Sequence, residues 1–187
     1  KMAFDGLPKE RISAMKKMPP FAILTIITLV AALLLALTNN VTVGPIASAA
    51  ENAANAARRV VLPTADNFEA LPNDGTVDAL YRGDAAGQPV GYAVTVTVTG
   101  FGGPIEVTVG MDMQGAITGM NVGGSKFAET AGLGTKAKEP GFTDQFKGKT
   151  TPLTLKKDVD AISGATITST AVTKAVNLAG AAVAAQQ

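Results

Sequence analysis

VGYAVTVTVT, residues 90–99, is the strongest secondary-structure signal in this 187-residue chain. Val94, Val96 and Val98 alternate with threonines, and this period of two is typical of a strand with one buried and one exposed face. We therefore expect a sheet, and the sequence on either side indicates its kind.

Two further strands follow along the chain. Residues 100–104 contain three glycines and a proline, which break the run, and Ile105, Val107 and Val109 then alternate with other residues. A turn at residues 112–115 leads to a third strand at residues 116–122. Because tight turns join the three strands, we expect an antiparallel meander.

Helical patterns lie outside this meander. A weak one covers residues 73–81, another covers residues 141–146, and a strong one lies at the C-terminus. The apolar face of the last helix consists of Ala171, Val172, Ala175, Val176, Ala179, Ala182 and Val183. This segregation of strands and helices predicts an α+β domain, not an alternating Rossmann fold. We expect the domain to span residues 60–187.

The composition narrows the possible functions. The chain has no Cys and no His, which excludes thiolate or imidazole metal sites, iron–sulfur clusters, and Ser-His or Cys-His nucleophile pairs. We therefore expect no metal site, and any redox chemistry requires an organic cofactor. The formal net charge of +1 argues against a nucleic-acid partner, because such domains usually carry a clear basic surplus.

The N-terminal third of the chain contains a candidate membrane anchor. No charged residue occurs at positions 18–50, and residues 21–37 are almost wholly apolar. At about 1.5 Å per helical residue, a helix over residues 18–37 reaches about 30 Å, which spans a bilayer once. We predict a transmembrane helix at residues 18–38 and an alanine-rich juxtamembrane helix or tether at residues 39–59.

Basic residues indicate the orientation of this anchor. Residues 1–17 hold five Lys and Arg residues against two acidic ones, whereas no basic residue follows the apolar run before Arg58. By the positive-inside rule, residues 1–17 stay cytoplasmic and the domain is extracytoplasmic, on a single-pass protein of the cell (inner) membrane. The alternative is a cleaved signal peptide, because residues 47–49, ASA, resemble a signal-peptidase site. The length of the apolar run favours the uncleaved anchor.

The segment DAISGATITSTAV, residues 160–172, crowds hydroxyl and small residues at the start of the C-terminal helix. Thr168, Ser169 and Thr170 are the expected N-caps of this helix. A helix N-terminus favours an anion, and the small residues Gly164 and Ala165 let a phosphate come close to the Thr166 hydroxyl. Taken alone, the segment also fits a capped helix that binds no ligand.

Three motifs together resemble one known family. Residues 160–166, DAISGAT, resemble the flavin-attachment signal of the FMN-binding domains found in Rnf electron-transport complexes and Na⁺-translocating NADH:quinone oxidoreductases. Residues 129–134, ETAGLG, are similar to the ETPGLG motif of that family, with Ala131 where proline is common. Residues 100–110 supply a third similarity. The length of the chain favours the Rnf branch of the family.

The resemblance implies a covalent cofactor. FMN would be joined through its phosphate to the hydroxyl of Thr166 by a separate flavin transferase that uses FAD. Asp160 either serves recognition by that transferase or simply ends the preceding surface segment. The cofactor site would also include the neighbours of Thr166 and the ETAGLG loop, namely Ser163, Gly164, Ala165, Ile167, Thr168, Glu129, Thr130, Gly132, Leu133 and Gly134. We expect Glu129 and Thr130 near the flavin ring or its ribityl chain.

The resemblance also implies an electron relay that is no catalyst on its own. No G-x-G-x-x-G motif follows a predicted strand, so the chain has no such nucleotide pocket to supply hydride. The implied partners are the lipid bilayer, the flavin transferase, and the iron–sulfur and flavin subunits of an ion-pumping complex that moves electrons between ferredoxin and NAD⁺. Two alternatives stay open: the FMN-carrying component of the quinone reductase, or an anchored scaffold whose Thr166 is never modified.

Overall fold

The computed structural model describes residues 19–187, and the predicted cytoplasmic segment at residues 1–17 lies outside them. The chain has two compact units, and the boundary between them falls between Ala49 and Ala50.

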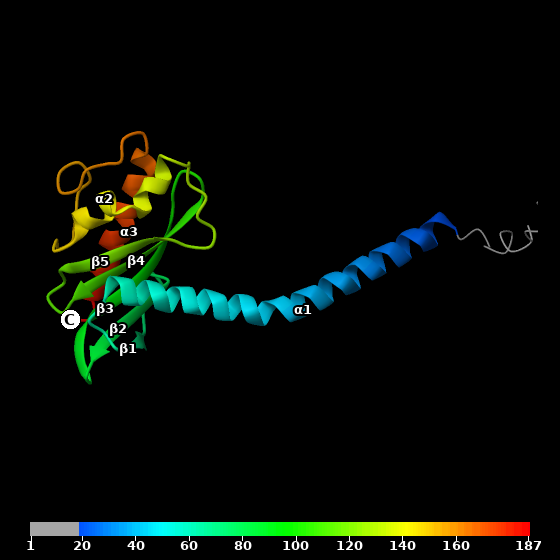
Figure 1. The fold of residues 1–187 in the computed structure, drawn as a ribbon, viewed down its shortest axis with the longest axis horizontal. Coiled ribbons are helices and arrows are strands. Elements are labelled where there is room, and N and C mark those ends of the chain that lie inside the picture. The colour runs from blue at the N-terminus through cyan, green and yellow to red at the C-terminus, as the bar shows by residue number, and fades with distance from the viewer. Residues whose placement is uncertain (1–18) are drawn as a thin grey trace, which may run out of the picture. The chain divides into compact units, whose positions relative to one another are not determined.

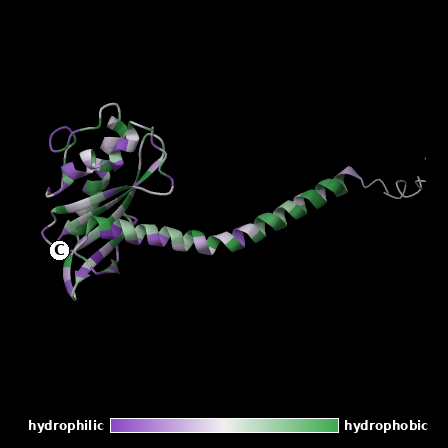
Figure 2. Ribbon diagram, in the orientation of Figure 1, coloured by the Kyte–Doolittle hydropathy of each residue, from purple (hydrophilic) through white to green (hydrophobic). Residues whose placement is uncertain are grey.

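The first unit contains, within the described residues, most of a long helix, α1 (Pro20–Val61). The best 18-residue window of α1 has a mean hydropathy of 2.7 and is not buried, so the helix is long and apolar enough to cross a membrane. Figure 2 shows the hydrophobic residues concentrated in its N-terminal half.

The helix does not break at the predicted ends of the anchor and the tether, residues 38 and 59. It continues through Pro45, because the alanine-rich stretch beyond has a high helix propensity. The limits of the membrane span stay a prediction.

The second unit is an α+β domain built on a five-stranded antiparallel sheet with the strand order β1-β2-β3-β4-β5 (Figure 1). The strands are β1 (Asn67–Leu71), β2 (Ala79–Ala85), β3 (Gln88–Thr99), β4 (Pro104–Asp112) and β5 (Ile117–Gly123). The three strands predicted from the sequence are confirmed as β3, β4 and β5, and the predicted meander extends by two more strands at its N-terminal edge.

The sequence pattern does not reveal β1 and β2. No residue of β1 is buried, and β2 buries only Leu80 and Gly83, so neither strand shows a clear hydrophobic alternation. The helix predicted at residues 73–81 is wrong, because this segment is a bend that leads into β2. The carboxylate of Asp74 accepts hydrogen bonds from the hydroxyl and the backbone N–H of Thr76 at 2.6 and 3.0 Å, and such local bonds compete with a helix.

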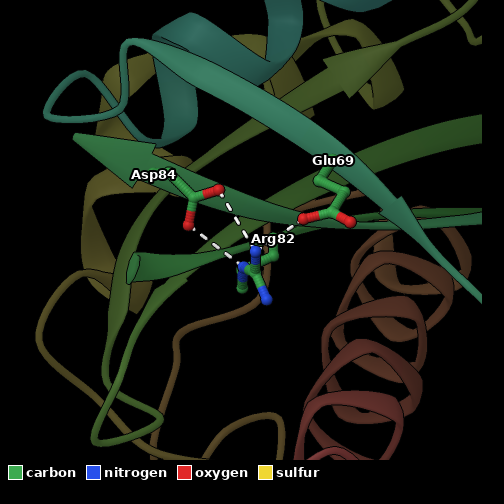
Figure 3. Close-up of polar contacts among 3 residues, drawn as sticks. All are labelled: Glu69, Arg82 and Asp84. Carbon is green, nitrogen blue, oxygen red and sulfur yellow. Dashed lines mark hydrogen bonds and ion pairs between the residues drawn. The ribbon is translucent and has the colours of Figure 1, made fainter. Parts of the chain in front are cut away.

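Arg82 of β2 joins the edge strand β1 to the sheet (Figure 3). Its Nη2 lies 2.5 Å from Oε2 of Glu69 on β1, and its Nε lies 3.0 Å from Oδ1 of Asp84. The hydrogen bond and the charge of Asp84, followed by the charge of Glu69, raise the pKa of Arg82. Because exposed ion pairs contribute little free energy, these contacts serve mainly to favour the register of β1.

The main core lies between the sheet and α3 (Thr166–Ala184), which packs on β3 and β4. Figure 1 shows α3 (red) running across the sheet. The predicted apolar face of this helix is confirmed: its residues are buried in the core, with Ala182 partly buried against it. Short helices η2 (Gly134–Lys138), α2 (Pro140–Thr143) and η3 (Asp144–Phe146) complete the domain, and the last two confirm the helical pattern at residues 141–146.

Candidate functional site

A cleft with a volume of about 500 Å³ lies at the start of α3. Three segments that are distant in the sequence form it: the turn between β3 and β4, the loop that follows β5 into η2, and the entry to α3. The lining residues are Phe101, Glu129, Thr130, Leu133, Gly134, Gly164, Ala165, Thr166, Ile167 and Thr168.

The structure brings together nine of the eleven residues that the sequence analysis assigned to the cofactor site. Ser163 and Gly132 do not line the cleft, and both are exposed. Gly132 has φ of +73° in the turn of the loop, where its N–H donates to the Thr135 hydroxyl at 2.9 Å. This backbone conformation favours glycine, so the residue serves the loop's shape.

Thr166 is the first residue of α3, and its side chain is exposed in the cleft. Ala165 is the N-cap residue, and no side chain caps the helix there. The N–H groups of the first helical turn therefore lack a side-chain acceptor and carry the positive end of the helix dipole. An anionic group beside Thr166 is favoured by this arrangement.

The predicted N-caps Thr168, Ser169 and Thr170 are wrong, because the helix begins ahead of all three. Ser169 stabilises this earlier start: its Oγ accepts the N–H of Ile162 at 3.0 Å and donates to the Ala165 carbonyl at 2.9 Å. Thr170 donates to the Thr166 carbonyl at 2.8 Å, within the helix. Thr168 is 1% exposed and points into the domain.

Glycines allow the loops around the cleft to approach one another. Gly164 has φ of +75°, and a Cβ there would lie 3.0 Å from Cδ2 of Leu133. A Cβ on Gly134 would lie 2.3 Å from Oε2 of Glu129, well inside contact distance. Glycine at position 164 thus leaves room for the Leu133 side chain beside the entry to α3, and glycine at position 134 leaves room for the Glu129 carboxylate within the loop.

The rim of the cleft is apolar. After α1, the described residues include three exposed large hydrophobic side chains, and all three line this cleft: Phe101 at 68%, Ile167 at 57% and Leu133 at 41% exposure. Such a concentration of exposed apolar side chains marks a binding surface. Phe101 was not among the predicted site residues, although an aromatic residue between glycines in a predicted turn is a usable signal.

These features fit FMN. The volume is that of a cofactor-sized pocket, the uncapped helix N-terminus suits a phosphate, and the apolar rim suits a flat ring system. A family model described as an FMN-binding domain matches residues 100–180, the part of the chain that contains the whole cleft. The protein is thus of the FMN-binding class.

Curated relatives define the family more narrowly. The chain is 37% identical over 181 residues to the G subunit of the Na⁺-translocating ferredoxin:NAD⁺ oxidoreductase complex of Acetobacterium woodii, a match covering 83% of this chain and 86% of that protein. It is 36% identical over 176 residues to the G subunit of an ion-translocating oxidoreductase complex of Methanosarcina acetivorans, with coverages of 88% and 93%. The chain belongs to the family of these G subunits.

Among solved structures, the chain matches the C subunit of the Na⁺-translocating NADH-quinone reductase of Parabacteroides distasonis. The two are 29% identical, and the match covers 55% of this chain and 59% of that one, with a TM-score of 0.47.

Proposed function

We propose that this protein is a membrane-anchored electron-transfer subunit of an ion-translocating ferredoxin:NAD⁺ oxidoreductase complex, and that it carries FMN as a phosphoester on Thr166. The observation that carries this proposal is the position of the Thr166 hydroxyl, which is exposed at an uncapped helix N-terminus inside the apolar-rimmed cleft. Bound FMN supplies the redox chemistry, and the protein supplies its position and surroundings.

The residues of the cleft divide into two roles under this proposal. Thr166 fixes the phosphate, and the first-turn N–H groups of α3 stabilise the negative charge that a phosphodiester keeps. Phe101, Leu133 and Ile167 shield the flat ring from water on the apolar rim. Gly164 leaves room for Leu133 beside the entry to α3, and Gly134 leaves room for the Glu129 carboxylate. The phosphoester bond to Thr166 would keep the cofactor in place through repeated electron transfers.

The proposed setting is the cell membrane. In this proposal α1 crosses the bilayer once, the basic segment at residues 1–17 lies in the cytoplasm, and the FMN domain lies on the outer side. The relay passes electrons between neighbouring carriers and does not act as a catalyst on its own. Iron–sulfur and flavin subunits are the proposed partners in the complex, and a flavin transferase is the partner during maturation.

The test is an intact mass of the full-length protein, produced together with a flavin transferase and denatured before measurement. We expect an added mass of FMN minus water, and peptide mapping of residues 158–174 should place it on Thr166. Thr166→Ala should remove the added mass and the flavin absorbance while the domain stays folded, because the side chain is exposed.

Thr170→Ala is the matched control, because Thr170 is also an exposed hydroxyl residue in the first turns of α3. This variant should keep the flavin. An unmodified wild-type peptide would favour the scaffold alternative, and flavin retained by Thr166→Ala would place the attachment elsewhere. Either result contradicts the proposal.

A further inference from the structure

Glu129 is a buried carboxylate whose two oxygens are both occupied. Among the described residues it is the only buried acidic side chain, at 7% exposure. Its Oε1 accepts the backbone N–H of Gly102 at 2.9 Å, and its Oε2 accepts the hydroxyl of Thr168 at 2.6 Å. Within residues 19–187, no Lys or Arg forms an ion pair with it. The carboxylate is therefore held by hydrogen bonds alone.

The surrounding backbone is fitted closely to this carboxylate. A Cβ added to Gly100 would lie 2.3 Å from Oε1, and one added to Gly134 would lie 2.3 Å from Oε2. A Cβ on Gly102 would lie 2.0 Å from the carbonyl oxygen of Ala128, so the turn rests directly on the chain just before Glu129. Glycine at positions 100 and 134 makes space for the Glu129 side chain, and glycine at position 102 lets the turn lie against the backbone before it.

The two hydrogen bonds join two segments of the cleft lining that are distant in the sequence. Gly102 follows Phe101 in the turn between β3 and β4, and Thr168 follows Thr166 and Ile167 at the start of α3. Phe101, Thr166 and Ile167 all line the cleft. The Glu129 side chain thus links the wall that presents Phe101 to the wall that presents the attachment hydroxyl.

We propose that Glu129 is a positioning residue, which holds the Phe101 turn and the first turn of α3 at a fixed separation and so sets the width of the cleft. It acts on the cofactor through geometry, not through its charge. This inference rests on the proposed function for its consequence on FMN, whereas the link between the two walls is testable without a cofactor.

A glutamine substitution distinguishes a role of Glu129 through its hydrogen bonds from a role through its negative charge. In Glu129→Gln the amide oxygen accepts the Gly102 N–H, and the amide NH₂ donates to the Thr168 hydroxyl, which can accept as well as donate. Both hydrogen bonds survive and the negative charge is lost. In Glu129→Ala both hydrogen bonds are lost. A positioning role therefore predicts rescue by glutamine.

The first measurement is amide hydrogen exchange on the full-length chain in a Thr166→Ala background, which carries no flavin at the proposed site. Loss of a hydrogen bond to a charged group raises the equilibrium constant for local opening by a factor of about ten or more. Glu129→Ala should therefore speed amide exchange at Gly102 by at least that factor. Glu129→Gln should keep most of the protection. Glu139→Ala is the control, because Glu139 is exposed and its side chain caps no helix.

A second pair of variants covers the case in which Glu129→Ala does not fold. Thr168→Val removes one donor and keeps the shape of the side chain, and it should also speed exchange at Gly102. Thr173→Val is its matched control, because Thr173 is a buried threonine of α3 whose hydroxyl bonds only to the Ser169 carbonyl. Equal exchange at Gly102 in both variants would overturn the link.

The second measurement uses the flavin-loaded protein. Visible circular dichroism of the flavin reports the asymmetry of its surroundings, and the reduction potential reports nearby charge. Glu129→Gln should preserve the dichroism, and Glu129→Ala should weaken it. A reduction potential that rises in Glu129→Gln as much as in Glu129→Ala would show that charge is what matters, and would overturn the positioning role. Failure of the proposed function appears separately, as missing FMN mass on Thr166, and leaves the exchange test intact.

Discussion

The two faces of the sheet are packed in different ways. On one face, α3 interlocks its valines with those of β3 and β4: Val172 and Val176 are fully buried, as are Val94 and Val107. On the other face, the end of α1 and the residue after it, Leu62, lie on a surface of glycines. The first face is held by the burial of side chains alone, whereas the second combines the buried side chains of Val61 and Leu62 with a close approach of backbone.

The distances at the glycine surface show how close this approach is. A Cβ on Gly110 would lie 2.1 Å from the carbonyl oxygen of Val61, and one on Gly83 would lie 2.5 Å from Cδ2 of Leu62. The hydroxyl of Thr118 donates to the same Val61 carbonyl at 2.6 Å. Arg58 lies over the ring of Tyr81, with 3.7 Å between Cζ and the ring centroid.

The two faces of the sheet should differ in their tolerance to substitution. A valine core adjusts to a lost methyl group at the cost of a small cavity, whereas a backbone carbonyl has no rotamer with which to avoid an added atom. The face under α3 also supports the candidate site, because the helix that starts with Thr166 is anchored by its buried body. The glycine surface sets how the end of α1 lies on the domain.

The largest effect is expected at the glycine surface, from Gly110→Ala. The new Cβ meets the Val61 carbonyl, and overpacking against backbone should lower the free energy of unfolding by about 3 kcal/mol. Thermal unfolding of the full chain in detergent measures this loss. Gly141→Ala is the control, because its Cβ meets nothing within 4 Å, and it should be neutral or slightly stabilising. Equal melting temperatures for the two variants would contradict the close packing of α1.

A smaller loss is expected on the valine face, from Val176→Ala. Val176 is fully buried, and removing two methyl groups should cost about 2 kcal/mol, including the cavity. Val60→Ala is the matched control, because Val60 is 66% exposed and its truncation should change stability by less than about 0.5 kcal/mol. A loss in Val176→Ala larger than that in Gly110→Ala would reverse the comparison of the two faces.

The same contrast explains which parts of the fold the sequence predicts. The valine face is predicted because β3 and α3 repeat their apolar residues at periods of two and 3.6. Glycines carry no such period, so the packing of Val61 and Leu62 on the opposite face is not predicted, and residue 60 appears only as a domain boundary. Periodicity also fails for β1 and β2, which bury too few residues.

The candidate site shows a similar division. Local motifs predict where Thr166 and the ETAGLG loop lie in the chain, and the structure brings most of these residues to one cleft. The bond between Thr168 and Glu129 joins residues 39 positions apart, and no local pattern reveals it. Propensity alone assigned Thr168 to a cap, whereas tertiary packing buries it.

The smallest effect is expected at Asp74, an exposed residue in the connection between β1 and β2. There the Thr76 hydroxyl, followed by its backbone N–H, lowers the pKa of Asp74 below the ordinary value of 3.8. A lowered folded-state pKa gives stability that is present above the unfolded-state pKa and is lost as the pH falls through the folded-state pKa. Asp74→Asn should therefore melt slightly below the wild type at pH 7, and the gap between the two melting temperatures should close as the pH falls below 3.8.

Melting curves of both proteins from pH 7 to pH 3 measure this gap. Salt should leave the gap largely unchanged, because the first cause of the lowered pKa is a hydrogen bond. A gap that widens on acidification would mean that Asp74 is destabilised in the folded state, and that this loop is held by something other than Thr76.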